Sequence, residues 1–276
     1  MSQAPVDSDN FCYRHPDRQS YILCQRCGRT VCPACSTQAA VGVHCPECVR
    51  EAKANAPRRQ PVQIRAARSL RSRSDQPLVT YTLIGVAVVV YIAQLALGDA
   101  FTTSLVYFGP ATFAQPWRLL TSLFAHGSPV HLLFNMYSLF VLGRMLEPAL
   151  GHIRFTAVYF LSGLGGSIAV LLIAPGTPVL GASGAIFGLL GALFVIVRRL
   201  GGNTAQLLIV VVLNLAIGFI VPGVAWQAHI GGVAIGAALA AIFVRTRGQK
   251  HRLLQAGLFV GVGVALLVVA ALRFAL

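Results

Sequence analysis

Two polar side chains that lie in separate apolar runs could do chemistry together. Ser183 stands near the start of a run that ends at Arg198. His229 stands near the start of a second run, which ends at Arg245. An ionisable side chain in an apolar segment is expensive in free energy and points by default to a functional site. A serine and a histidine on two closely packed helices are the minimum set for a nucleophile that is activated by a base.

Small residues recur at four-residue spacing beside Ser183 and His229, which supports a second interpretation. These residues are Gly181, Gly184, Ala185, Gly188, Gly232 and Gly236. Small-xxx-small patterns let membrane helices approach closely, and serine is an ordinary residue in such interfaces. From these residues alone, helix packing and catalysis both remain open.

A third polar group lies in the segment His131-Leu132-Leu133-Phe134-Asn135. The i and i+4 spacing places His131 and Asn135 on one helical face. The pair could be an interfacial histidine with an asparagine that bonds a neighbouring helix, or two donors aimed at an oxyanion. His126 stands at the end of an expected 30-residue outer loop and could buttress it by hydrogen bonds.

All seven cysteines precede residue 49, and with one histidine they form four pairs, each separated by two residues. The pairs are Cys12 with His15, Cys24 with Cys27, Cys32 with Cys35, and Cys45 with Cys48. This spacing is typical of zinc knuckles, and eight ligands fill two tetrahedral sites. The odd number of cysteines argues against a disulfide framework. His44 is a spare imidazole that could replace a neighbouring ligand. Residues 11–49 are too few to fold on an apolar core, so the metal would supply folding free energy.

Seven apolar segments must position these groups. They cover roughly residues 78–98, 129–146, 153–174, 181–197, 205–221, 224–244 and 253–273. Several fall at or slightly below the ~20 residues that a membrane-spanning helix needs. The sequence therefore predicts seven transmembrane helices.

Loop charges predict the orientation of these helices. Residues 50–77 carry eight basic side chains, namely Arg50, Lys53, Arg58, Arg59, Arg65, Arg68, Arg71 and Arg73. By the positive-inside rule this linker, which we expect to be disordered, places the N-terminus in the cytoplasm. It could also bind anionic lipid headgroups. The later loops predicted inside are basic, whereas the outer loops 175–180 and 222–223 hold no charge. The cysteines then lie in a reducing compartment, which favours zinc over disulfides.

The same topology predicts the depth of the two candidate catalytic groups. Ser183 lies 15 residues before Arg198, and His229 lies 16 residues before Arg245. At ~1.5 Å per residue, these positions are roughly 22 and 24 Å above the cytoplasmic boundary. In a hydrocarbon core of ~30 Å, both side chains lie at matching height below the outer surface.

Composition agrees with a multi-span membrane protein. The chain has 276 residues, of which 56% are hydrophobic and 11% charged, about half the charge of an average soluble domain. The net charge is +14, and the basic residues cluster beside apolar segments, as topology signals do. We therefore expect no nucleic-acid partner.

Residues 1–10 lack the apolar core of a signal peptide. His-Glu-x-x-His and a pair of intramembrane aspartates are both absent, which argues against metallo- and aspartyl proteases of the membrane.

Five short motifs follow one another along residues 78–250. They are Trp117-Arg118, His131-x-x-x-Asn135, Glu147-x-x-x-Gly151, Gly181-x-Ser183-Gly184 and Ala228-His229-x-x-Gly232-x-x-x-Gly236. In this order the chain resembles the rhomboid family of intramembrane serine proteases.

The resemblance implies a role for each motif. Ser183 would be the nucleophile, and His229 its general base and then the acid that protonates the leaving amine. Phe187 would stack on His229 at a place where many relatives have tyrosine. The backbone N–H of Ser183 with the side chains of His131 and Asn135 would form the oxyanion hole. Trp117 and Arg118 would brace the outer loop, and Glu147 the cytoplasmic end of the second span.

The sequence thus predicts an all-α polytopic membrane protein, preceded by a small zinc-bound module. The resemblance implies a six-helix core, and the seventh helix extends beyond it. The expected divisions are residues 1–50 for the cytoplasmic module, 51–77 for the linker, 78–250 for the protease core and 251–276 for the additional helix. The module resembles a B-box-like double zinc finger, which implies that the first and third pairs share one ion and the second and fourth the other.

The expected function is cleavage of transmembrane protein substrates at the plasma membrane, with the active site open toward the outer face. The lipid bilayer and a protein that binds the zinc module are the other expected partners, and catalysis needs no cofactor. The alternative function is a catalytically inactive rhomboid-like adaptor that is regulated by its zinc module.

Overall fold

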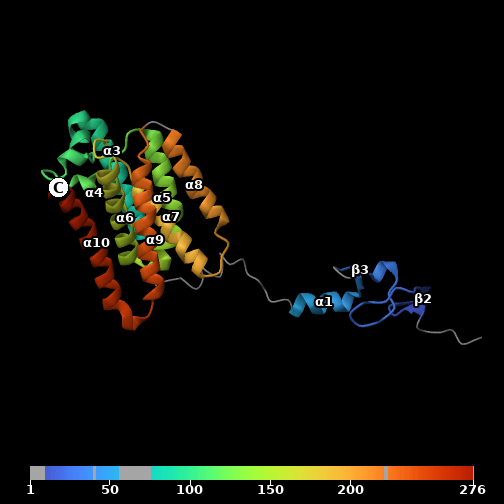
Figure 1. Ribbon diagram of the computed structural model, residues 1–276. Coiled ribbons are helices and arrows are strands. Elements are labelled where there is room, and N and C mark those ends of the chain that lie inside the picture. The colour runs from blue at the N-terminus through green and yellow to red at the C-terminus, as the bar shows by residue number, and fades with distance from the viewer. Residues whose placement is uncertain (1–9, 40–41, 56–75, 221–222, 276) are drawn as a thin grey trace, which may run out of the picture. The chain divides into compact units, whose positions relative to one another are not determined.

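A computed structural model describes residues 10–39, 42–55, 76–220 and 223–275 (Figure 1). The chain separates into two compact units, residues 1–59 and 60–276, and each is described by itself. Most of the expected linker, including the arginines at 58, 59, 65, 68, 71 and 73, lies outside the described residues. Its first residues, with Lys53, continue the helix α1, which covers Pro46–Asn55.

The N-terminal unit contains two small antiparallel sheets as well as α1. Strands β1 (Phe11–Cys12) and β2 (His15–Gln19) form one sheet, and β3 (Thr37–Gln38) and β4 (Val43–His44) form the other. A 3-10 turn, η2, covers Pro33–Cys35. The buried apolar cluster of this unit consists of six cysteines and Val31. So small an apolar core cannot stabilise a fold by hydrophobic burial alone.

Each of the seven apolar segments of the second unit contains a helix. The helices are α3 (Leu78–Leu105), α5 (Pro129–Leu150), α6 (His152–Ile173), α7 (Ser183–Arg199), α8 (Ala205–Ile220), α9 (Trp226–Arg245) and α10 (Arg252–Ala275). Shorter turns are η3 (Gly109–Ala111), α4 (Arg118–Thr121) and η4 (Gln249–His251). Among the described residues, the four helices α3, α6, α9 and α10 are long and apolar enough to cross a membrane by length and composition. The helix α7 is shorter, with 17 residues.

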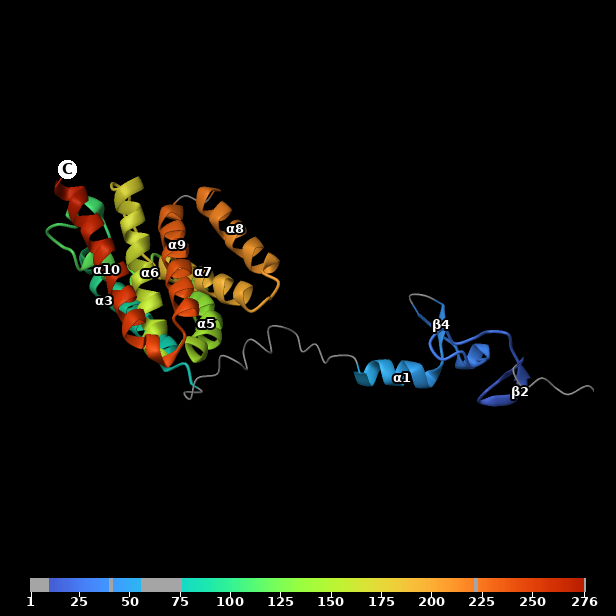
Figure 2. The same cartoon turned by 60° about the horizontal axis from the view of Figure 1, so that its bottom comes forward.

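The helices α6, α7 and α9 form the centre of the bundle. The most extensive contacts in this unit are those of α9 with α7, followed by those of α6 with α9 and with α7. The helices α8 and α10 lie at opposite edges (Figures 1 and 2). The seventh helix, α10, packs mainly on α6. Candidate catalytic groups on α7 and α9 are therefore held by the best-packed part of the unit.

Glycines account for the close packing of α7 on α9. A Cβ atom at Gly232 would collide with the carbonyl oxygen of Gly184, and one at Gly236 with that of Gly188. At Gly191, an added Cβ would lie 2.5 Å from the carbonyl oxygen of Val233. The small-xxx-small patterns therefore do produce a helix interface, in which backbone contacts backbone.

The first helix and the loop that follows it differ from the expectation. The sequence predicts that the first segment ends at residue 98, but α3 continues to Leu105 beyond a kink at Gly98, where φ is +76°. Glycine adopts this left-handed conformation without a steric penalty, so the chain can turn and resume a helix. The loop that follows is ordered by η3, by α4 and by a pair of backbone hydrogen bonds between Tyr107 and Val179, both 2.9 Å long. The expected loop is thus partly helical and bridged to the segment before α7.

Candidate functional site

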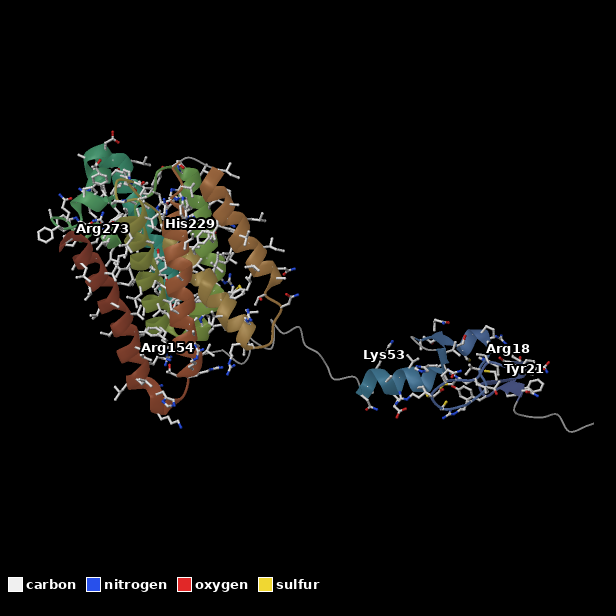
Figure 3. All side chains as sticks on the ribbon, viewed as in Figure 1. Arg18, Tyr21, Lys53, Arg154, His229 and Arg273 are labelled. Atoms are coloured by element: carbon white, nitrogen blue, oxygen red, sulfur yellow. The ribbon has the colours of Figure 1, made fainter. Side chains whose placement is uncertain are left out.

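The structure brings Ser183 and His229 into direct contact. The Oγ atom of Ser183 lies 2.9 Å from Nε2 of His229. Ser183 is the first residue of α7, and His229 lies in the first turn of α9. Close packing of α7 on α9 therefore sets this distance. Figure 3 shows His229 near one end of the bundle, the end opposite Arg154. His229 is buried, whereas Ser183 is partly exposed.

The ring of Phe187 fixes the plane of the imidazole. Its centroid lies 4.0 Å from that of His229, and the two planes differ by 6°. Phe187 stands one turn after Ser183 on α7, so a single helix supplies both the hydroxyl and the stacking ring. The histidine is thus held between a hydrogen bond at its edge and an aromatic face.

Within the described residues, no carboxylate orients the other ring nitrogen of His229. Its Nδ1 atom is buried and has no hydrogen-bond partner among the described residues. Asp99 and Glu147 are the two acidic residues in the described part of the membrane unit, and Glu147 is bonded elsewhere. Ser183 and His229 therefore form a pair in which packing positions the imidazole.

The start of α7 presents unpaired backbone donors beside the Ser183 hydroxyl. The first bond of this helix runs from the N–H of Ile186 to the carbonyl of Ala182, so the N–H groups of the first three helical residues have no acceptor within the helix. The positive end of the helix dipole lies at the same place. Such a helix start can stabilise a negative charge that develops nearby.

Gly181 brings His131 and Asn135 close to this helix start. Its φ angle is +120°, and its N–H donates to the carbonyl of Ser122 at 2.8 Å. A Cβ atom at Gly181 would lie 2.8 Å from Nε2 of His131 and 3.8 Å from Nδ2 of Asn135. Glycine is required here both by the backbone angle and by the lack of space.

The first turn of α5 holds the ring of His131 in place. Ser128 caps this helix, because its Oγ accepts from the N–H of His131 at 3.1 Å. The N–H of Gly127 makes a long contact of 3.5 Å to Nδ1 of His131. His126 packs edge-on against the same ring with centroids 5.1 Å apart. Asn135 donates from Nδ2 to the carbonyl of His131 at 3.0 Å, which leaves its second N–H free to donate elsewhere.

Gln94 is a residue of the site region that sequence reasoning missed. This buried side chain accepts from the N–H of His126 at 2.9 Å and donates to its carbonyl at 3.2 Å. It thereby ties α3 to the chain just before α5. A glutamine inside the apolar segment 78–98 was the available signal, because polar side chains within membrane helices usually bond a neighbouring helix.

Arg118 is the first residue of α4, in the segment between α3 and α5. Its Nη1 donates to the carbonyl of Val106 at 3.2 Å, which joins α4 to the end of α3. Trp117 precedes α4 and is 53% exposed. An exposed indole suits the membrane interface, where tryptophan is enriched.

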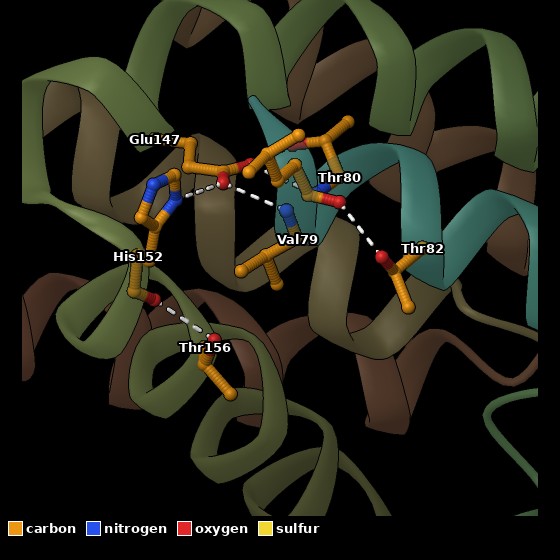
Figure 4. Close-up of polar contacts among 7 residues, drawn as sticks. Val79, Thr80, Thr82, Glu147, His152 and Thr156 are labelled. Atoms are coloured by element: carbon orange, nitrogen blue, oxygen red, sulfur yellow. Dashed lines mark hydrogen bonds and ion pairs between the residues drawn. The ribbon is translucent and has the colours of Figure 1, made fainter. Parts of the chain in front are cut away.

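Glu147 ties the start of α3 to the junction of α5 and α6 (Figure 4). The carboxylate is fully buried and accepts from the N–H groups of Val79 and Thr80, each at 2.8 Å. It also accepts from the Thr80 hydroxyl at 2.6 Å and contacts Nδ1 of His152 at 2.6 Å. Gly151, at φ +81°, ends α5 and begins the turn into α6. Glu147 is thus a structural clamp at the end of the bundle opposite Ser183.

The eight metal-ligand candidates of the N-terminal unit form two tetrads. One consists of Cys12, His15, Cys32 and Cys35, and the other of Cys24, Cys27, Cys45 and Cys48. The ligand atoms of each tetrad lie within 4.8 Å of one another. The first pair thus joins the third and the second joins the fourth, as the double-finger resemblance implied. His44 belongs to neither tetrad.

Distances within the tetrads fit a tetrahedral zinc ion. Zn–S bonds of ~2.3 Å and Zn–N bonds of ~2.0 Å place two ligand atoms roughly 3.5–3.8 Å apart. The Sγ atoms of Cys27 and Cys45 are 3.7 Å apart. Nδ1 of His15 lies 3.5 Å from Sγ of Cys32 and 3.3 Å from Sγ of Cys35. Both tetrads could therefore hold a metal ion of this size.

The thiols of each tetrad differ in how readily they ionise. Burial, with neighbouring thiols acting in the same direction, raises the pKa of Cys35 to about 11 and that of Cys48 to about 12. Burial also acts to raise the pKa of Cys24, but hydrogen bonds from backbone groups outweigh it and lower that pKa to about 6. The N–H of Cys45 is one such donor, 3.2 Å from Sγ of Cys24. A set of thiols that cannot all ionise together is suited to a cation, which compensates their charge.

Comparisons with known proteins agree with the geometry of the membrane unit. A model of the Rhomboid domain matches residues 114–246. The chain is 34% identical over 211 residues to rhomboid protease GluP of Bacillus subtilis (strain 168), which covers 71% of this chain and 41% of that protein. It is 37% identical over 141 residues to the putative rhomboid protease YdcA of the same organism, which covers 49% of this chain and 71% of that protein.

A plant protein gives a similar result. RHOMBOID-like protein 4 of Arabidopsis thaliana is 40% identical over 129 residues, which are 44% of this chain and 32% of that protein. The chain therefore spans only about a third to two fifths of the length of GluP and of the plant protein. All three relatives carry a rhomboid name, and together with the apolar helices they indicate a multi-pass membrane protein.

Proposed function

Because the chain belongs to the rhomboid family of intramembrane serine proteases, we propose that it is an active endopeptidase that cleaves transmembrane proteins. The observation that carries the proposal is the 2.9 Å contact between the Ser183 hydroxyl and Nε2 of His229. The comparisons support the family, and the dyad supports activity within it. A chain that served only as an adaptor would have no need to keep this contact.

In the proposed mechanism, Ser183 attacks the scissile carbonyl carbon. Nε2 of His229 takes the hydroxyl proton as the C–O bond forms, and the carbonyl electrons move to its oxygen. The same nitrogen then gives that proton to the leaving amine as the C–N bond breaks. A water molecule, deprotonated by His229, then attacks the acyl carbon. The C–O bond to Ser183 breaks as the acid product forms, and His229 returns the proton to the serine oxygen. The stack on Phe187 keeps the ring in position through both proton transfers.

Three donors are proposed to stabilise the oxyanion. They are the backbone N–H of Ser183, the ring of His131 and the free N–H of Asn135. The contact of the Gly127 N–H with Nδ1 of His131 favours the tautomer that carries its proton at Nε2, the ring nitrogen that lies nearer Gly181. Helices α5, α7 and α9 all begin around this point, so three positive dipole ends face the developing charge.

The location of the dyad suggests the class of substrate. Ser183 is partly exposed at the start of α7, where polar groups can meet water that enters from the membrane surface. A substrate helix protects its peptide bonds by its own hydrogen bonds, so it must unwind locally before attack. We therefore propose that the enzyme prefers a small residue at the cut site, with glycine or proline nearby.

The proposed topology places residues 1–50 in the cytoplasm and the dyad near the outer face of the plasma membrane. Basic residues at the helix ends far from Ser183, among them Arg144, Arg154, Arg198 and Arg245, support this orientation through the positive-inside rule. Residues 51–77 would connect the module to the protease core of 78–250, and residues 251–276 would add a seventh span. The module would bind two zinc ions in a B-box-like fold and contact a protein partner.

Co-expression with a reporter tests the proposed function. The reporter is a single-span protein whose helix carries Ala-Gly near its outer end, with tags on both sides of the membrane. Wild-type enzyme should release the outer tag, and Ser183→Ala should not. A matched reporter with Leu-Leu in place of Ala-Gly should be cut more slowly. Release by Ser183→Ala at the wild-type rate would refute the role of the dyad, and equal cleavage of both reporters would refute the helix-breaker preference.

A further inference from the structure

A cavity of about 390 Å³ lies between the last turns of α7 and α9. Its lining consists of Val195, Arg198, Arg199, Ala241, Val244 and Arg245. The volume falls within the range of ~300–1,000 Å³ that is usual for ligand pockets. Since α7 begins at Ser183 and ends at Arg199, the cavity lies roughly 24 Å along that helix from the dyad. It is therefore separate from the proposed active site.

Within the part of the chain that the structure describes, the three arginines of the cavity have no counter-ion. Among the described residues, none of Arg198, Arg199 and Arg245 forms an ion pair or donates a side-chain hydrogen bond. In the described membrane unit, the carboxylate of Glu147 is engaged with α3 and His152, and Asp99 follows the kink toward the other end of α3. Three positive charges around one cavity repel one another unless an anion joins them.

Capping of the helix ends does not explain these arginines. At the end of α7, the N–H groups of Leu200 and Gly202 satisfy the carbonyl of Val197. At the end of α9, Thr246 bonds the carbonyl of Ile242 with both its N–H and its hydroxyl. Backbone and hydroxyl donors thus already serve these carbonyls, and the guanidinium groups are left available.

Arg154, at the same end of the bundle, shows what an internally satisfied arginine looks like in this fold. It donates to the carbonyl of Leu150 at 3.2 Å and to Oε1 of Gln255, and its guanidinium lies 5.5 Å from the ring centroid of Phe243. Arg154 therefore links α6, α9 and α10. The cavity arginines are exposed, line one cavity and have no such role in the described residues.

We propose that this cavity binds the phosphate group of an anionic glycerophospholipid. A guanidinium donates two parallel hydrogen bonds to phosphate oxygens, which makes arginine well suited to this anion. Val195, Ala241 and Val244 give the cavity an apolar wall that suits the glycerol and the first acyl carbons. A free phosphate ion would match the guanidinium groups but would leave this wall without a partner. The site and its ligand do not depend on whether the chain is a protease.

Native mass spectrometry of the purified, delipidated full-length chain in a neutral detergent tests the proposal. The probes are dioctanoyl phosphatidylglycerol, dioctanoyl phosphatidylcholine, glycerophosphoglycerol and inorganic phosphate. Each arginine near a lipid headgroup contributes about 1 kcal/mol, so replacing all three by glutamine should weaken phosphatidylglycerol binding by more than about tenfold. Arg144→Gln is the matched control, because it removes one exposed charge on the same side of the bundle without touching the cavity, and it should leave binding nearly unchanged.

A second variant separates the cavity from general surface charge. Ala241→Leu keeps all three arginines but fills the apolar wall, and it too should weaken phosphatidylglycerol binding. Ala241→Leu also tests the proposal if the triple variant fails to elute as a folded species in gel filtration. Equal binding of phosphatidylcholine, or unchanged phosphatidylglycerol binding in Ala241→Leu, would overturn the proposal. If glycerophosphoglycerol or phosphate binds as tightly as the lipid, the ligand is a soluble anion and the lipid assignment is wrong.

Discussion

At the scale of single residues, packing orients the imidazole of His229, a task that a third polar residue would otherwise perform. Nδ1 of His229 has no partner in the described residues, so the ring is oriented by its bond to Ser183 and by its stack on Phe187. An aromatic stack restricts tilt, but it permits rotation within the plane more readily than a hydrogen bond would. The position of the base should therefore be sensitive to the residue at position 187.

Replacing Phe187 tests this dependence. Phe187→Ala removes the stacking face and should lower kcat on the order of 10²-fold, since displacing a catalytic group by about 1 Å can cost that much. Phe187→Tyr keeps the face and is the control, with kcat near wild type. Steady-state kinetics on the reporter helix would measure both. A Phe187→Ala enzyme with full kcat would show that the stack does not position His229.

The proposed oxyanion donors, His131 and Asn135, make a separate prediction at this scale. His131→Ala or Asn135→Ala should each lower kcat by roughly 10²–10³-fold with little change in KM, because these donors act on charge that develops in the transition state. Val130→Ala, an exposed neighbour on the same turn, is the control. An increase in KM at constant kcat would instead mean that the two side chains bind substrate in its ground state.

At the scale of elements, the interface of α7 with α9 sets the distance within the dyad. The carbonyls of Gly184 and Gly188 contact positions 232 and 236 so closely that a single methyl group would collide with them. Any side chain at these positions must push the helices apart. The Ser183–His229 distance and the stability of the bundle should therefore change together.

Gly236→Ala measures this coupling. Overpacking costs about 1–3 kcal/mol, so the Tm should fall by several degrees, and activity at permissive temperature should fall as well. Gly257→Ala on α10, where an added Cβ meets nothing within 4 Å, is the control. A Gly236→Ala chain with the wild-type Tm would indicate that α7 and α9 pack less closely than described.

At the scale of the whole molecule, two units of different chemistry share one chain. The N-terminal unit has almost no apolar core, so bound metal would provide most of its folding free energy. We expect two zinc ions per full-length chain by inductively coupled plasma mass spectrometry. Cys24→Ser should remove one of them, whereas His44→Ala, which lies outside both tetrads, should retain two. Two ions in Cys24→Ser would contradict the ligand assignment.

Much of the site could be predicted because its parts lie in local patterns. The positions of Ser183 and His229 relative to the basic helix ends predicted their matching depth, and the glycine spacing predicted a close interface. The bond between Gln94 and His126 joins distant segments of the chain, and periodicity does not encode such contacts. The cavity beside Arg198 could not be predicted for a related reason, since a basic flank looks the same in sequence whether or not it lines a cavity.

Labelling of the nucleophile is the sharpest test of the proposed dyad. Membranes that contain the full-length enzyme are treated with a fluorophosphonate probe, and the modified residue is mapped by mass spectrometry. We expect an adduct on Ser183 in the wild type, and loss of labelling in both Ser183→Ala and His229→Ala. Labelling that persists in Ser183→Ala, or a wild-type enzyme that cleaves the reporter while Ser183 stays unmodified, would contradict the proposal that Ser183 and His229 form the catalytic pair.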